Sequence, residues 1–123
     1  QLMTDQSNAI SQIEEAYEYM LAYAALGKST EGAGPGGASI RDFLANFLKG
    51  AKTLETWIEG ASDIAPEVRN EYLKASSLIS GVINMMLQKD NISSVIVDNA
   101  NALMATRHYL TLVFFLDKMY LDS

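Results

Sequence analysis

Residues 40–61 read IRDFLANFLKGAKTLETWIEGA, and their apolar side chains recur at alternating steps of four and three residues. This spacing keeps one face of an α-helix apolar turn after turn. The apolar stripe consists of Ile40, Leu44, Phe47, Ala51, Leu54, Ile58 and Ala61. A helix with one apolar face must bury that face against another element, so the stretch predicts a helix inside an all-α fold.

Three other stretches carry the same kind of pattern and supply the partners. The four expected helices cover about residues 5–26, 39–61, 66–89 and 92–120 of a single domain, residues 1–123. Ser39 and Asp42 form an S-x-x-D start signal, in which the serine hydroxyl accepts from a free backbone amide of the first turn. Pro66 suits the first turn of the third helix, because an amide hydrogen is not needed there.

The connections between the helices predict the topology. The two later connections are short, which makes their neighbouring helices antiparallel. The first connection, residues 27–38, reads GKSTEGAGPGGA; it has five glycines and exceeds the length that a tight bundle needs. We therefore expect an antiparallel up-down-up-down four-helix bundle with a long Gly-rich loop between its first two helices. The composition of this loop leaves open whether it is functional or merely mobile.

Composition excludes several classes of protein. A chain that is 49% hydrophobic and 20% charged is not a disordered tail. With no cysteine it has no disulfide, no zinc–thiolate site and no covalently attached haem. Its net charge of −6, with scattered Lys and Arg, opposes nucleic-acid binding. Since no apolar run is long enough to cross a membrane and no signal peptide is recognised, we expect a soluble cytoplasmic protein.

Two sequence motifs lack the surrounding structure or residues that their usual function requires. Residues 22–29 match a loose phosphate-loop pattern that ends in Gly-Lys-Ser, but a helix leads into it, whereas the phosphate cradle needs a strand before and a helix after. Carboxylate pairs four residues apart occur at Glu14/Glu18, Glu55/Glu59 and Glu67/Glu71. A di-iron bundle would also need Glu-x-x-His, which the chain lacks, so we expect solvated carboxylates, no metal and no cofactor.

The fourth expected helix carries polar residues where a stripe should be apolar. Continuing the stripe back from Tyr109 places Asn99 and Thr106 inward, where they fix the register or line a small polar pocket. Arg107 is the group that would bind an anion in such a pocket. His108, the sole histidine, fits a boundary between helices or subunits, with a cofactor ligand as the alternative. Arg107 and His108 diverge by about 100° on one helix, which disfavours an enzyme that uses both.

The end of that helix is apolar nearly all round, from Tyr109 to Leu121. A bundle buries one stripe, so an outer apolar face must be covered by something else. The expected surplus residues are Leu112, Phe115 and Met119, joined by Phe43 and Trp57 from the second helix. A second subunit related by two-fold symmetry is the natural cover. The alternatives are the Gly-rich loop and the segment around Leu2 and Met3.

These patterns lead to one functional hypothesis and two alternatives. The first is a non-catalytic interaction or regulatory module that acts as a homodimer and that can also bind another protein. The second is a bundle that binds a small molecule or cofactor through Asn99, Thr106, Arg107 and His108. The third is an enzyme that uses Arg107 or His108, which the divergence of the two side chains disfavours.

Overall fold

The computed structural model describes residues 4–32 and 39–121, and within them it is all-helical. The helices are α1 (Asp5–Ala25), α2 (Ile40–Gly60), α3 (Pro66–Leu87), α4 (Ser94–Ala102) and α5 (Met104–Tyr120). The expectation of an all-α chain is therefore confirmed for the described residues. Part of the predicted Gly-rich loop, residues 33–38, lies outside them, as do Leu2 and Met3.

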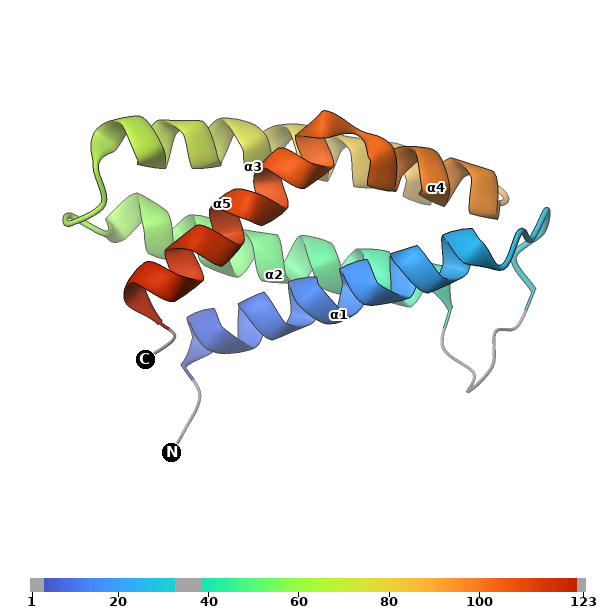
Figure 1. Cartoon of the computed structure of the whole chain (residues 1–123), viewed down its shortest axis with the longest axis horizontal. Helices are drawn as coiled ribbons and strands as arrows, with labels where there is room; N and C mark the ends of the chain where they lie inside the picture. Colours follow the sequence, from blue (N-terminus) through green and yellow to red (C-terminus); the bar gives the residue numbers. More distant parts are fainter. Residues whose placement is uncertain (1–3, 33–38, 122–123) are drawn as a thin grey trace.

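The helices pack along the long axis of the molecule (Figure 1). α1 packs on α2 and on α4, α2 packs on α3, and α3 packs on α5. α5 crosses diagonally from α3 toward the start of α1, so the first and last helical residues lie at the same end (Figure 1). The core lies between these helices. Of the seven apolar stripe residues within 40–61, six are buried and Ala61 is half-buried.

The helix starts have the expected local chemistry. The Ser39 hydroxyl accepts a hydrogen bond from the Asp42 amide at 3.1 Å, and Pro66 is the first residue of α3. The Thr4 hydroxyl caps α1 in the same way: it accepts a hydrogen bond from the Ser7 amide at 3.0 Å. Each hydroxyl satisfies an amide that has no partner within its helix.

A glycine allows α1 and α2 to approach closely. A Cβ atom added at Gly50 would lie 2.7 Å from the carbonyl oxygen of Ala9 and 3.0 Å from the Ile13 side chain. Both of these atoms belong to α1, and the Ala9 oxygen is backbone that cannot swing aside. The crossing of the two helices therefore depends on the missing side chain at Gly50.

The prediction of one helix over residues 92–120 is wrong, because the segment is two helices that meet at Leu103. Leu103 has φ −61° and ψ 136°, an extended conformation that ends α4 and begins α5. The buried Thr106 hydroxyl donates to the Ala100 carbonyl at 2.7 Å and so provides a partner for an oxygen at the end of α4. The break lets α4 follow α1 while α5 crosses α3, which one straight helix could not do.

The break also changes which face of the chain is buried. After it, the predicted inward residues Thr106, Tyr109 and Val113 are buried as expected. Before it, Val95 is 68% exposed and Asn99 is exposed, so the inward position predicted for Asn99 is wrong. The extrapolation assumed a continuous helical period, and the extended residue at 103 interrupts that period.

The described part of the first connection is held by hydrogen bonds. The Lys28 amide donates to the Ser94 hydroxyl at 2.8 Å, and the Ser94 amide donates to the Lys28 carbonyl at 2.9 Å. Glu31 forms an ion pair with Arg41 at 2.7 Å and accepts from the Ile92 amide at 2.7 Å. The first half of the loop is thereby attached to the start of α2 and to the connection between α3 and α4. The helix α1 ends at Ala25, so a helix and not a strand leads into the Gly-Lys-Ser sequence, as the sequence pattern predicts.

Candidate functional site

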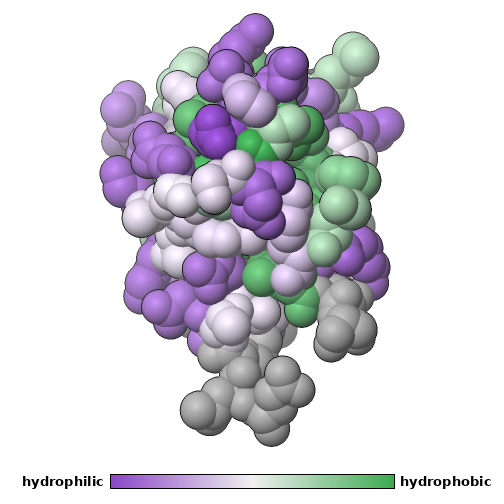
Figure 2. Space-filling view, turned by 90° about the vertical axis from the view of Figure 1, so that its left-hand side faces the viewer, coloured by the Kyte–Doolittle hydropathy of each residue, from purple (hydrophilic) through white to green (hydrophobic). Residues whose placement is uncertain are grey.

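The outer side of α5 carries the apolar residues that the sequence singles out as surplus. Phe115 is 55% exposed and Met119 is 56% exposed, while Leu112 is half-buried against the core. These three residues are spaced by three and four positions and share one side of the helix. We call Leu112, Phe115 and Met119 the α5 face. Viewed from the end at which α5 finishes, apolar surface gathers toward the upper right and hydrophilic surface toward the left (Figure 2).

The two aromatic residues of α2 lie at different places. Trp57 contacts Tyr120 edge-on, with ring centroids 6.1 Å apart, so it adjoins the end of α5. Phe43 stacks on Tyr19 of α1 with centroids 4.1 Å apart. Phe43 precedes Trp57 by about 21 Å along α2, at 1.5 Å per residue. The structure thus places Trp57 against Tyr120 at the end of α5, and Phe43 in the contact between α1 and α2.

A second apolar surface, which the sequence argument missed, lies between α3 and α4. Met85 is 70% exposed and Leu78 is 56% exposed, and both line a groove that stays open because α4 packs on α1. We call it the α3/α4 groove; its apolar lining consists of Leu78, Val82, Met85, Met86, Ile96, Ala100 and Leu103. The steps of four and three from Leu78 to Val82 and Met85 are a second helical stripe beside the core stripe, and this was the signal available in the sequence.

The four polar residues predicted for a ligand pocket do not converge. Asn99 lines the α3/α4 groove, and its amide donates to Val95 of its own helix at 2.8 Å. Thr106 is fully buried at the helix break, and Arg107 is exposed. His108 Nε2 lies 2.9 Å from Glu71 Oε2, and both side chains are half exposed. His108 therefore joins α5 to α3 at the surface.

The asparagine that α4 does bury is Asn101. Its side chain is 7% exposed, and its amide nitrogen donates to the Met20 carbonyl of α1 at 3.2 Å. Its amide oxygen has no hydrogen-bond partner among the described residues. Asn101, and not Asn99, is therefore the inward-facing asparagine of α4, and it ties the end of α4 to α1.

A pair of tyrosines forms the polar centre of the core. The hydroxyl oxygens of Tyr72 and Tyr109 lie 2.7 Å apart, and neither residue is exposed to solvent. Burial raises the pKa of the Tyr72 hydroxyl to about 12, although hydrogen bonds with Tyr109 and Ser76 oppose the shift. Burial also raises the pKa of Tyr109, and the neighbouring Tyr72 adds to that shift. Both phenols therefore stay protonated near neutral pH and act as a hydrogen-bonded pair inside the core.

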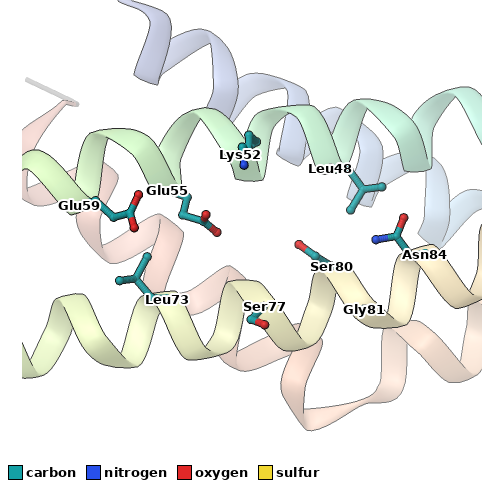
Figure 3. A pocket seen from close by; sticks show the side chains of 9 residues that line it. All are labelled: Leu48, Lys52, Glu55, Glu59, Leu73, Ser77, Ser80, Gly81 and Asn84. Atoms are coloured by element: carbon teal, nitrogen blue, oxygen red, sulfur yellow. The ribbon is translucent and has the colours of Figure 1, made fainter.

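Polar side chains extend from the region of the tyrosine pair to a polar groove on the surface. The hydroxyl of the buried Ser76 donates to Glu55 Oε2 at 3.4 Å. Glu55 borders a hollow of about 650 Å³ between α2 and α3, lined by Leu48, Lys52, Glu55, Glu59, Leu73, Ser77, Ser80, Gly81 and Asn84. In Figure 3 the two glutamates reach from α2 toward α3, and Ser80 and Asn84 reach back. The charged residues of the lining are one lysine and two glutamates.

The described residues show two further features that bear on function. In residues 4–32 and 39–121, no group of three or more His, Asp or Glu side chains lies close enough to hold a metal ion. In the same ranges, no helix combines the length and the apolar character needed to span a bilayer. Among the described residues, the α5 face and the α3/α4 groove expose large apolar side chains.

Comparison of the chain with protein-family models, with curated proteins and with solved structures finds no significant match. The function must therefore be inferred from the surfaces themselves.

Proposed function

We propose that this protein is a non-catalytic interaction module that forms a homodimer through its α5 face. In this proposal the fold is an antiparallel up-down-up-down four-helix bundle whose fourth member is α4 and α5 in succession. One observation carries the proposal: Phe115 and Met119 are more than half exposed on one side of a helix whose opposite side is buried.

The energetics favour covering this face. Removing the exposed half of a Phe or Met side chain from water contributes about 1 kcal/mol. Two-fold symmetry uses the same face twice, so Phe115 and Met119 of each copy both contribute. A stable dimer also buries about 800 Å² on each partner. The α5 face would be the centre of such an interface, with the exposed Phe114 next to it.

The test is the mass of the protein in solution. Size-exclusion chromatography with light scattering should report two chains for the native protein. Phe115→Asp should report one chain, because it places a charge in the middle of the apolar contact. Circular dichroism should show unchanged helix content, since the Phe115 side chain is more than half exposed within one chain.

Leu78→Asp is the matched control. Leu78 is 56% exposed, close to the 55% of Phe115, but it lies in the α3/α4 groove. This variant should keep the mass of two chains. A native protein with the mass of one chain, or a Phe115→Asp variant that still has the mass of two, would contradict the proposal.

A further inference from the structure

The α3/α4 groove consists of two adjoining, mainly apolar hollows that are open to solvent. The part between α3 and α4 has a volume of about 430 Å³, and a second hollow of about 660 Å³ extends it along α3. The two hollows share Val82 and Met85. Methionine side chains are flexible and adapt to the shape of a bound apolar surface.

The length of the α3/α4 groove fits one helix. Lys74 lines one end and Lys89 lines the other. These two positions are fifteen residue steps apart, which corresponds to about 22 Å along a helix axis, or about four turns. An amphipathic helix of this length places apolar side chains at positions i, i+4 and i+7, which matches the spacing of Leu78, Val82 and Met85.

The charged residues of the groove lining indicate which kind of partner helix the groove favours. The lining of the two hollows includes two lysines, Lys74 and Lys89, and no Asp or Glu. The chain as a whole has 15 acidic and 9 basic residues, so this absence of carboxylates departs from its overall charge. A lysine at each end of an apolar groove attracts a helix whose outer positions are acidic. A second copy docked antiparallel by two-fold symmetry would place lysines opposite lysines, which disfavours it.

We propose that the α3/α4 groove binds an acidic amphipathic α-helix of about four turns from another protein. Its apolar face packs on Leu78, Val82 and Met85, and its acidic positions lie near Lys74 and Lys89. This inference goes beyond the proposed homodimer and uses a different surface.

The two surfaces are separated along the helices. The Glu71–His108 contact joins α3 to α5. From that contact Leu78 lies about 10 Å along α3, and Phe115 lies about 10 Å along α5 in roughly the opposite direction. The antiparallel course of the two helices is visible in Figure 1. One partner can therefore occupy the groove while the α5 face is paired.

The first experiment selects binders from a displayed library of amphipathic helices about 18 residues long. The apolar-face positions are randomised among Leu, Ile, Met and Phe, and the outer positions among Glu, Gln and Lys. Selection uses the native protein, with Leu78→Ser as the counter-target. The expected result is a set of binders enriched in Glu over Lys, each binding Leu78→Ser about tenfold more weakly, a loss of ~1.4 kcal/mol.

The second experiment uses one selected peptide and three variants. Lys74→Glu combined with Lys89→Glu should weaken binding about tenfold and should make the protein prefer a Lys-substituted version of the peptide. Phe115→Ser, matched to Leu78→Ser in exposure, should leave peptide affinity unchanged. In methyl NMR spectra the peptide should shift Met85 and Met86 but not Met119, and raised salt should weaken the effect.

Several outcomes would overturn the inference. A library that yields no binder preferring native protein over Leu78→Ser would show that the groove does not bind helices. Binders without an excess of Glu would remove the role of the lysines. Met85 shifts that depend on protein concentration alone would show that a second copy occupies the groove. None of these outcomes depends on the mass measurement with Phe115→Asp, so the two proposals fail separately.

Discussion

At the scale of single residues, the Tyr72–Tyr109 pair shows how a polar group is tolerated in the core. Each phenol buries a large apolar ring, and the ring centroids lie 5.4 Å apart in a tilted contact. Each hydroxyl finds its main partner in the other at 2.7 Å. A buried hydroxyl that loses its partner costs far more than the net value of the bond, because its desolvation is no longer compensated.

This asymmetry predicts non-additive mutations. Tyr72→Phe should lower the free energy of unfolding by about 1–3 kcal/mol, and Tyr109→Phe should do so by a similar amount, because each leaves the other hydroxyl short of a partner. The double variant should lose clearly less than the sum, since neither hydroxyl then remains to be desolvated. Guanidinium unfolding of the four proteins measures this coupling. Losses that simply add would show that the two hydroxyls do not depend on each other.

The polar residues of the last segment show what residue-level reading of a sequence can reach. Thr106 was predicted to point inward and does so, but its hydroxyl satisfies Ala100 at a helix break rather than a ligand. Asn99 was predicted inward and is exposed, while Asn101 is the buried amide. The residue types in this segment indicated that polar side chains are buried in the core there. Which groups these polar side chains contact depended on the backbone break at Leu103, and no Pro or Gly at this break signals it in the sequence.

At the scale of the helices, Gly50 approaches its neighbouring helix more closely than any other described glycine does. Gly50→Ala would push a methyl group against the Ala9 carbonyl, and the two helices would have to move apart. We expect a loss of about 1–3 kcal/mol in the free energy of unfolding, seen as a lower melting temperature.

Gly81→Ala is the control for that change. Gly81 also lies inside a helix, and a Cβ atom there would meet nothing within 4 Å. Alanine is the better helix former by about 0.5–1 kcal/mol, so this variant should melt at a higher temperature than the native protein. If both alanine variants shift the melting temperature in the same direction, close packing at Gly50 is not the cause.

Helix existence was far easier to predict than helix pairing. Caps at Ser39 and Pro66 and the stripe over residues 40–61 define α2 and the start of α3 within one residue, because these are local signals. The packing of α4 on α1, which opens the α3/α4 groove, is not a local property. It follows from where the break at Leu103 directs two short helices, and periodicity within each helix does not encode that direction.

At the scale of the whole molecule, one ion pair joins the first connection to the middle of the chain. Arg41, near the start of α2, forms an ion pair with Glu31 at 2.7 Å and donates to the carbonyls of Leu87 at 2.8 Å and Lys89 at 2.5 Å. Glu31 also accepts from the Ile92 amide. Two regions that are distant in sequence meet at this pair: the loop before α2 with the start of α2, and the end of α3 with the approach to α4.

This pair should make stability depend on pH in a defined direction. The hydrogen bond with Arg41 lowers the pKa of Glu31 below its ordinary value of 4.5. Burial opposes this shift with a smaller effect, and the bond from the Ile92 amide lowers the pKa further. The unfolded chain then binds the proton more readily than the folded chain does. The contribution of Glu31 is fully present above about pH 5 and is lost as the pH falls through the lowered pKa. Glu31→Gln should therefore be less stable than native protein at pH 7, with a difference that shrinks toward pH 3.

Glu14→Gln tests the sign, because the pKa of Glu14 is shifted the opposite way. Desolvation raises the pKa of Glu14, and the nearby charges of Asp117 and Glu18 raise it further. The charged form of Glu14 therefore destabilises the folded chain, so Glu14→Gln should be more stable than native protein at pH 7 and lose that advantage as the pH falls. Urea unfolding of the three proteins at pH 7, 5 and 3 gives both differences. A Glu31→Gln deficit that stays constant across this range would mean that the ionisation of Glu31 does not contribute to stability.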